Sequence, residues 1–360
     1  MRYLIVLLLA SFSIHAKADK PTSLELEQAL ASYRDSAALL HKADSFIYAR
    51  RAYKIARQLY PDDPDSLGPI AYTYALAASR YQEPVALEQY EVALELLTKA
   101  NGPESDKLVP VLVDAAEEAI HRNEPEKAYL FTKSARDLIK LHGLDNSFLA
   151  ARSHMALARQ YWNSDEKDRA VQHAEFAKGL ASNYNHETGY PNHANLLYWH
   201  AQIMRWHGDY LNAEPSYEKA LGIFLAKEPR NRKVLSIHKH MVAVSHHLED
   251  QKRLAYHCIE GEKWENVRGM SFHWEIYDPT GNKYAKHKPR RGQIIASYTL
   301  GTDCKAHNIT ILKTDGISYT EAAEFIARRY FPPRFREGKL SPDQLVDQAH
   351  FNVYESSSAK

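Results

Sequence analysis

The sequence predicts a mainly helical protein: an α-solenoid of about six helix–turn–helix repeats, followed by a small α+β domain with the order strand, strand, helix, strand. Three observations lead to this prediction. A pattern of small residues returns about every 42 residues through the middle of the chain. Glycine is scarce, at 14 of 360 residues, which disfavours folds built on glycine-rich loops. Alternation of apolar and polar residues, typical of strands, begins only at Gly292.

The composition is that of a folded protein, with 44% hydrophobic and 25% charged residues. Lysine and arginine number 46 against 45 aspartate and glutamate, so the formal net charge is +1. A protein that coats nucleic acid needs a strong basic excess, and this balance argues against that class. The two cysteines, Cys258 and Cys304, are too few for a disulfide scaffold or a four-cysteine zinc site.

The first 18 residues have the pattern of a cleaved export signal. A basic residue, Arg2, precedes an apolar run from Tyr3 to Ile14, and Ala16-Lys17-Ala18 fits the small-x-small site of signal peptidase. The alternative is an uncleaved anchor, but the run is shorter than the roughly 20 apolar residues that cross a bilayer. We therefore expect a soluble mature chain without a membrane span, in the periplasm if the source is a Gram-negative bacterium.

The middle of the chain repeats an alanine that is followed by a small or aromatic residue four positions on and by another alanine seven positions on. Copies start at Ala49, Ala86, Ala128, Ala170 and Ala213, with a degenerate sixth at Ala255. Twelve residues before these lie Ala37, Tyr74, Ala116, Ala158, Ala201 and Ala243. Because this spacing places small side chains on one helical face, two helices of a unit can approach closely there. Each unit is therefore expected to be a helix, a short turn, a second helix and a longer loop.

These residues resemble the tetratricopeptide repeat family. The best copy contains Leu197, Ala201, Gly208, Tyr210, Ala213, Tyr217 and Ala220. The period near 42 is similar to that of the longer variety found in kinesin light chains. The resemblance covers residues 30 to 262, within a predicted repeat domain of residues 19–265, and implies a concave face that binds other proteins. An unrelated helical bundle is disfavoured, because such bundles do not keep a register over five units.

Counting from Gly208 as the turn residue predicts which side chains line the concave face of units four and five. They are Arg152, Arg159, Trp162, Asn195, Tyr198, Gln202, Arg205 and Trp206. Aromatic rings and arginines on one strip suit a peptide groove, since they offer flat apolar contact and forked donors. The alternative, in which Trp162 and Trp206 are buried between repeats as core, stays open.

The carboxyl third predicts a different fold. Residues 292–300 and 308–312 have strand patterns around a hairpin turn at 301–305, residues 320–329 have a helical face, and residues 349–354 form a last strand. The predicted domain covers residues 292–360, and a linker or first-strand region covers 266–291. The basic part of this linker, residues 283–291, could contact anionic lipid or an acidic partner, or be solvated.

An ordered set of residues in this third resembles the carboxy-terminal domain of TonB, the energy transducer of outer-membrane uptake. The set is Gly292, Ile294, Tyr298, Asp303, Ile309, Ile311, Ala322, Ala323, Tyr330, Pro332, Gly338, Phe351 and Val353. Arg328 stands where that family has a tryptophan, and the proline-rich spacer is absent. The resemblance implies that a partner peptide adds a strand to the sheet edge formed by the last strand, near Tyr330, Phe335, Phe351 and Val353.

Sequence motifs for catalysis or for a cofactor are not found, so the expected protein is not an enzyme and has no cofactor. Histidines gather near Cys258, at His238, His240, His246, His247 and His257. They are expected to be exposed helical residues, with a metal site as the alternative. In an oxidising compartment a disulfide between Cys258 and Cys304 would join the two domains, a pairing that the sequence leaves open.

The sequence therefore predicts a non-enzymatic periplasmic adaptor that binds proteins through a helical groove and a TonB-like domain. Its expected partners are proteins or peptides, such as TonB-dependent receptors or components of the TonB system, and not nucleic acid. The alternative is a structural envelope protein that contacts peptidoglycan and has no receptor specificity. A second alternative is a module that binds metal through its histidines.

Overall fold

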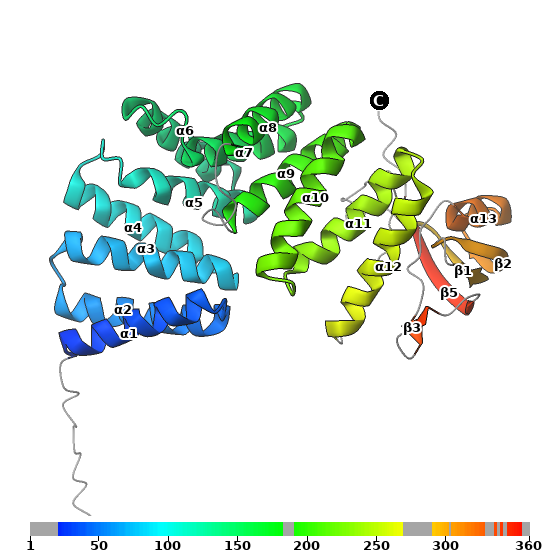
Figure 1. Ribbon diagram of the computed structural model, residues 1–360, viewed down its shortest axis with the longest axis horizontal. Coiled ribbons are helices and arrows are strands. Elements are labelled where there is room, and N and C mark those ends of the chain that lie inside the picture. Colours follow the sequence, from blue (N-terminus) through cyan, green and yellow to red (C-terminus); the bar gives the residue numbers. More distant parts are fainter. Residues whose placement is uncertain are drawn as a thin grey trace, which may run out of the picture. The chain divides into compact units, whose positions relative to one another are not determined.

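A computed structural model describes residues 21–182, 191–268, 290–301, 304–327, 335–336, 339–340 and 344–354. The predicted signal segment, residues 1–18, lies outside the described residues, as does most of the linker region 266–291. The described chain contains thirteen helices and five strands (Figure 1). It divides into two compact units, Met1–Leu138 and Ile139–Lys360.

The helices of the two units alternate with short turns, as the repeat pattern predicts. The first unit contains α1 (Ser23–Ala38), α2 (Lys42–Leu59), α3 (Pro64–Tyr81), α4 (Ala86–Asn101), α5 (Leu108–His121) and most of α6 (Pro125–Leu141). The second contains α7 (Phe148–Asn163), α8 (Lys167–Ala181), α9 (Asn192–His207), α10 (Tyr210–Lys227), α11 (Arg232–His247) and α12 (Gln251–Arg268). Successive hairpins stack within a unit, with α2 against α3 in the first and α10 against α11 in the second.

Six turns with the same backbone geometry join the helices in pairs. Each has one residue in the left-handed region: Leu40, Gln82, Asn123, Asp165, Gly208 and Glu249. In the fifth turn, Gly208 N–H donates to the Arg205 carbonyl at 3.2 Å and Asp209 N–H donates to the Met204 carbonyl at 2.9 Å, and the other five turns repeat this pair of bonds. This is the Schellman end of a helix. The same pair of bonds also occurs at Gly143, in the loop that follows α6. The six turns inside the hairpins recur at intervals of 41 to 43 residues, which confirms six helix–turn–helix repeats.

The turns also correct the repeat register in three units. In units three to five, the predicted alanines lie seven residues before and five after the turn residue, for example Ala201 and Ala213 around Gly208, and they are buried. The same count gives Tyr33 and Ser45 in unit one, Ala75 and Leu87 in unit two, and Val242 and Leu254 in unit six. The predicted starts at Ala49, Ala86 and Ala255 therefore do not match the observed positions, which are Ser45, Leu87 and Leu254. Inner helices carry alanine on more than one buried face, so alanine alone does not fix the register.

The carboxyl part is a small sheet with a helix on it. Its elements are β1 (Arg290–Leu300), β2 (Ala306–Asp315), α13 (Tyr319–Ala327), β3 (Phe335–Arg336), β4 (Lys339–Leu340) and β5 (Gln344–Tyr354). An antiparallel three-stranded sheet has the order β2-β1-β5, and β3 pairs with β4. The predicted order of strand, strand, helix, strand is observed, with longer strands than expected. The β3–β4 pair was not predicted.

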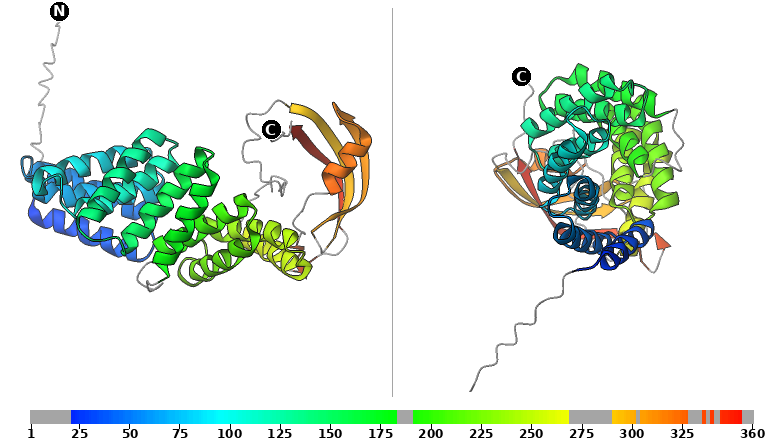
Figure 2. Two further views of the ribbon diagram at one scale, coloured as in Figure 1. Left: turned by 90° about the horizontal axis from the view of Figure 1, so that it is seen from above. Right: turned by 90° about the vertical axis from the view of Figure 1, so that its left-hand side faces the viewer.

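One face of β1 forms the core of this part. Ile294, Ala296, Tyr298 and Leu300 are buried at alternate positions, as the sequence alternation predicts. Ala322 and Ile326 of α13 belong to the same buried cluster. The helix therefore covers one face of the sheet (Figure 2).

A disulfide joins α12 to the turn between β1 and β2. Cys258 and Cys304 are bonded, with their Cα atoms 6.5 Å apart. Both sulfur-bearing residues are buried, and they form an apolar cluster with Val242 and Leu254. The last helix of the repeats is therefore covalently attached to the small sheet, within the second unit.

Two glycines give a matched pair of tests. A Cβ at Gly292 would lie 2.3 Å from the Asp315 carbonyl oxygen, whereas a Cβ at Gly222 in α10 would meet nothing within 4 Å. We expect Gly292→Ala to destabilise the sheet by about 1–3 kcal/mol through overpacking. Gly222→Ala should stabilise α10 by roughly 0.5–1 kcal/mol, because alanine favours helix. Hydrogen exchange of β1 and α10 amides measures both, and unchanged β1 exchange in Gly292→Ala would contradict the close approach.

The disulfide predicts a loss of stability on removal. The bonded residues are 46 positions apart. Loop-closure entropy for that length is about 4 kcal/mol at 25 °C, within the usual range of about 2–5 kcal/mol. Cys258→Ser with Cys304→Ser should lower the free energy of unfolding of the second unit by this order in denaturant titrations. Peptide mapping without reductant should recover the two cysteines in one crosslinked peptide, and finding both as free thiols would rule out the bond.

Candidate functional site

The first helices of repeats four and five, α7 and α9, carry the eight residues predicted to line a groove, and α11 of repeat six packs beside them. Four of the eight are buried, namely Arg152, Tyr198, Gln202 and Arg205, which are between 3% and 8% exposed. The other four, Arg159, Trp162, Asn195 and Trp206, are partly buried and reach the surface. The strip thus has a buried polar layer below a partly exposed one.

An aromatic cluster forms the exposed layer between α7 and α9. The rings of Trp162 and Trp206 stack with centroids 5.5 Å apart, and Trp199 lies 6.3 Å from Trp206. The Arg159 guanidinium lies 3.9 Å from the centroid of the Trp199 ring. The sequence left open whether Trp162 and Trp206 line a groove or are buried as core between repeats. In the structure they pack against the repeat core and also remain partly exposed.

Hydrogen bonds of the buried layer connect α9 with α11. The Gln202 side-chain amide donates to the Tyr198 hydroxyl at 2.8 Å and contacts His240 Nδ1 at 2.7 Å, while Arg205 donates to Gln202 Oε1 at 3.1 Å. Lys233 of α11 donates to Asn195 of α9. Because Gln202 bonds to its own helix and to the next one, it holds the two first helices in register.

Positive charge collects around the Tyr198 ring. Burial raises the pKa of the Tyr198 hydroxyl, while the Gln202 hydrogen bond and the charges of Arg205 and Arg159 oppose that rise. The Lys233 ammonium lies 5.2 Å from the centroid of the Tyr198 ring. Cations and flat rings on adjacent helices can bind the carbonyls and carboxylates of an extended protein segment.

Sequence reasoning missed Trp199 and Lys233. Trp199 directly follows the predicted Tyr198, and a helix places neighbours about 100° apart, so the two lie on adjoining faces of α9. Lys233 belongs to the sixth repeat, whose register the alanine pattern misplaced. The aromatic run in residues 198–206 was the signal that could have found Trp199.

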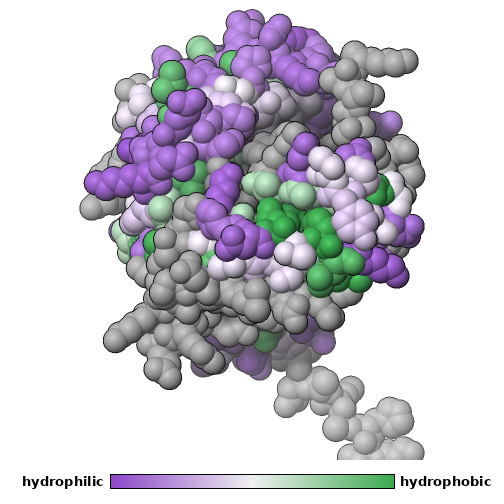
Figure 3. Space-filling view, turned by 90° about the vertical axis from the view of Figure 1, so that its right-hand side faces the viewer, coloured by the Kyte–Doolittle hydropathy of each residue, from purple (hydrophilic) through white to green (hydrophobic). Residues whose placement is uncertain are grey.

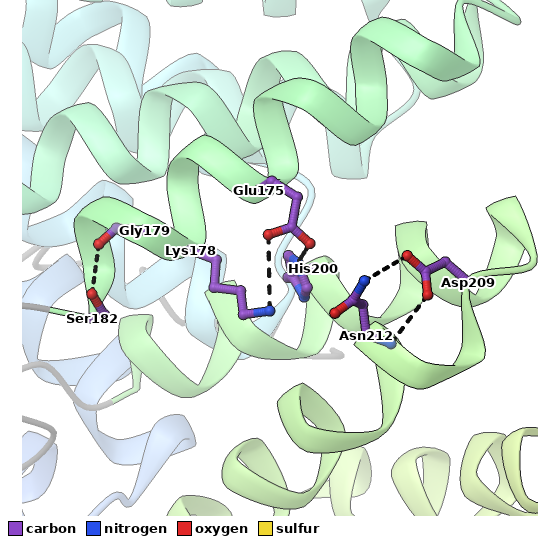
Figure 4. Close-up of polar contacts among 7 residues, drawn as sticks. All are labelled: Glu175, Lys178, Gly179, Ser182, His200, Asp209 and Asn212. Atoms are coloured by element: carbon purple, nitrogen blue, oxygen red, sulfur yellow. Dashed lines mark hydrogen bonds and ion pairs between the residues drawn. The ribbon is translucent and has the colours of Figure 1, made fainter.

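A buried histidine supports the strip from the side of α8 (Figure 4). His200 is fully buried, and its Nε2 lies 2.9 Å from Glu175 Oε1 of α8, while the Lys178 ammonium is 3.9 Å from Glu175 Oε2. Burial lowers the pKa of His200, and the hydrogen bond from His200 lowers the pKa of Glu175. Within the described part of the chain, His200 Nδ1 has no hydrogen-bond partner. The contact fixes α9 against α8, and the cap of α10 by Asp209 lies beside it.

The sequence predicts that a partner binds at the sheet edge formed by the last strand, which is β5. Strand β5 is at one end of the sheet order and pairs with β1, with Phe351 opposite Ile294 and Val353 opposite Gly292. Phe335 lies in β3, and Tyr330 lies outside the described residues. Figure 3 shows an apolar area beside hydrophilic side chains on the face of the molecule that it presents.

The histidines near Cys258 have separate partners. His238 contacts His257, His240 contacts Gln202, and Cys258 is in the disulfide. Both His238 and His257 are buried, so the expectation of exposed histidines was wrong for this pair. Across residues 21–182, 191–268 and the described parts of the sheet, no group of three or more metal-binding side chains is found. None of the described helices has the length and apolarity needed to cross a membrane.

Comparison with known proteins finds likenesses among solved structures only. No protein-family model and no curated protein matches the chain. BtubC (BKLC) from P. vanneervenii is 20% identical over 57% of this chain and 92% of its own, with a TM-score of 0.41. PilF from Pseudomonas aeruginosa is 15% identical over 69% and 94%, with a TM-score of 0.43. A putative kinesin light chain from Podosopora anserina is 13% identical over 59% and 100%, with a TM-score of 0.42.

At these identities the likeness concerns the fold alone. The class of the protein follows from the six hairpins themselves, which repeat about every 42 residues, are closed by one repeated turn and, in repeats three to five, are packed through alanines. This is the architecture of an α-solenoid of helix–turn–helix repeats. The solved structures that the chain is similar to include tetratricopeptide and kinesin-light-chain-like repeat proteins.

The contact between Glu175 and His200 gives a test of how the strip is supported. Glu175→Ala leaves His200 Nε2 without its acceptor and should lower the free energy of unfolding by about 1 kcal/mol, whereas Glu175→Gln keeps an acceptor and should cost less. The pKa of Glu175 is lower in the folded protein than in the unfolded chain. Ionised Glu175 therefore adds to the stability of the fold at pH values above the ordinary pKa of a glutamate, and this stability is lost as the pH falls through the lower pKa of the folded state. Denaturant titrations at neutral and acidic pH measure it. Equal stability of both variants at neutral pH would contradict the contact.

Proposed function

We propose that this protein is a non-enzymatic scaffold that holds a protein segment along the strip formed by α7, α9 and α11. One observation carries the proposal: Arg159 lies on the Trp199 ring beside the stacked Trp162 and Trp206, on the partly exposed layer of neighbouring first helices. Exposed tryptophan and arginine together are typical of the centre of protein interfaces. The buried layer below them fixes the helices that present these side chains.

The bound segment is extended and acidic in this proposal. Arg159, Arg205 and Lys233 place positive charge around Tyr198. A carboxylate of the segment would meet Arg159 and Lys233, which reach the surface, while Arg205 is buried and acts by its charge through Gln202. Guanidinium groups suit carboxylates because both present paired atoms in one plane.

The finer proposal places this scaffold in the periplasm as an accessory to TonB-dependent outer-membrane transport. Its support is the export-signal pattern of residues 1–18 and the resemblance of residues 292–360 to the TonB carboxy-terminal domain. The order β2-β1-β5, with a helix between β2 and β5 and with β5 at the end of the sheet, is compatible with a partner that adds a strand. The alternative is an envelope scaffold that contacts peptidoglycan and has no receptor specificity.

Crosslinking identifies the partner and then tests the strip. A photoreactive amino acid at Trp199, introduced in cells of the source, should trap a protein with an acidic segment, whereas the same group at Tyr129 in α6 should not. A synthetic peptide of the trapped segment should then bind the purified protein. Arg159→Gln with Lys233→Gln should weaken binding about tenfold or more at low salt, since both charges face the segment.

Lys252→Gln, which removes one positive charge from α12, is the matched control and should bind as the wild type does. Equal affinity of the Arg159/Lys233 variant and the wild type would dismiss the strip. Recovery of TonB-dependent receptors with the full chain would favour the transport role, whereas recovery of peptidoglycan alone would favour the structural alternative. The Arg205 site suggested by the sequence is a poor choice for mutation, because its side chain is buried.

A further inference from the structure

Two buried imidazoles face each other in the last repeat. His238 of α11 and His257 of α12 are 4% and 3% exposed, and their Nδ1 atoms are 3.0 Å apart. A hydrogen bond between two Nδ1 atoms needs a proton on one and a lone pair on the other. The contact therefore exists only while at least one of the two rings is unprotonated at Nδ1.

The fourth repeat contains the same pair. His154 of α7 and His173 of α8 have their Nδ1 atoms 2.9 Å apart. Both pairs lie eleven residues before and eight after the left-handed turn residue, which is Asp165 in repeat four and Glu249 in repeat six. The fold does not require histidine at these places, because repeat five has Leu197 and Ser216 there. Repeat five therefore supplies a non-titrating version of the same helix contact.

Charged groups around the pair come from α10, α11, α12 and the β1–β2 turn. Burial lowers the pKa of His238 to about 4, against the effect of Glu260. Burial also lowers the pKa of His257 to about 3, reinforced by His238 and Arg253 and opposed by Asp250. The Tyr256 ring contacts both imidazoles. Glu214 and Glu218 of α10 form ion pairs with Arg253, and Lys252 lines the same pocket as His257. His246, His247 and Lys305 form a separate group of charges at the end of α11 and in the β1–β2 turn.

We propose that the His238–His257 pair is an acid-sensitive latch that holds α12 on α11 at neutral pH and holds it less firmly under mildly acidic conditions, where the opened form becomes more frequent although the closed form still predominates. The closed helix pair keeps both rings neutral, whereas an opened α12 exposes them to water. Exposed histidine takes up a proton near pH 6.5. Below that pH the opened form binds more protons than the closed form, so a fall in pH favours opening. Above that pH neither form binds protons at these rings, and the closed helix pair has its full stability.

The position of the latch couples it to the small sheet. His257 precedes Cys258, which is bonded to Cys304 in the turn between β1 and β2. Val242 of α11 and Leu254 of α12 pack around this disulfide. Opening of α12 therefore loosens the base on which the sheet is anchored, while the covalent bond keeps the two parts together.

Hydrogen exchange of the full, oxidised chain tests the latch. The opening constant of α12 is measured at pH 7.5 and pH 5.5 and corrected for intrinsic exchange. Two histidines that titrate near 6.5 only in the opened form raise this constant about 100-fold between these pH values. Helix α3, which contains no histidine, serves as the internal reference and should change little.

The double variant His238→Leu, His257→Ser places the residues of repeat five in repeat six. The opening constant of α12 in this variant should change less than about threefold between pH 7.5 and pH 5.5. His246 and His247 account for the small change that is left. Wild-type α12 protection that is equal at both pH values would overturn the proposal, as would an equal pH effect in wild type and variant. If the variant does not fold, nitrogen NMR of the wild-type imidazoles decides: both rings neutral at pH 5.5 in the folded chain is the expected result, and a protonated His238 or His257 overturns it.

Discussion

The close contact between the two helices of each repeat is the constraint on which the rest of the structure depends. In the inner repeats this contact is made by alanines with almost no exposed surface, such as Ala158, Ala170, Ala201 and Ala213. Nothing larger fits between backbones at that distance without moving a helix. When the two helices of a repeat are held at a fixed distance, the other side chains of the first helix also have fixed neighbours. The stacking of Trp162 on Trp206 and the hydrogen bonds of Gln202 depend on this fixed arrangement.

The repeat period and the change of fold near the carboxyl end could be predicted from the sequence, because small residues and strand alternation leave regular patterns. The turns inside the hairpins could not be predicted, since only Gly208 among their six left-handed residues is a glycine. The others are leucine, glutamine, asparagine, aspartate and glutamate, which the backbone bonds of the turn hold in a conformation they seldom adopt. Two-residue strands such as β3 and β4 are too short to show a pattern.

The candidate site was predicted in outline and not in depth. Counting from a turn residue shows which face of a helix a side chain occupies, and the structure leaves Arg159, Trp162 and Trp206 of that face partly exposed. Depth depends on the neighbouring helix, and α11 covers part of α9, so Tyr198, Gln202 and Arg205 are buried. The histidine pairs join residues 19 positions apart on two helices, and their contact depends on a turn register that the alanines did not fix.

The disulfide also determines how tension would travel through the second unit. A pull between the two ends of the chain passes from Cys304 directly to Cys258, and the stretch between these residues, which differ by 46 positions, carries no load. At about 3.4 Å per extended residue, roughly 150 Å of contour length is withheld from extension. A force on the sheet would therefore act on the middle of α12 rather than on its end, and would shear that helix from its neighbour instead of unwinding it turn by turn.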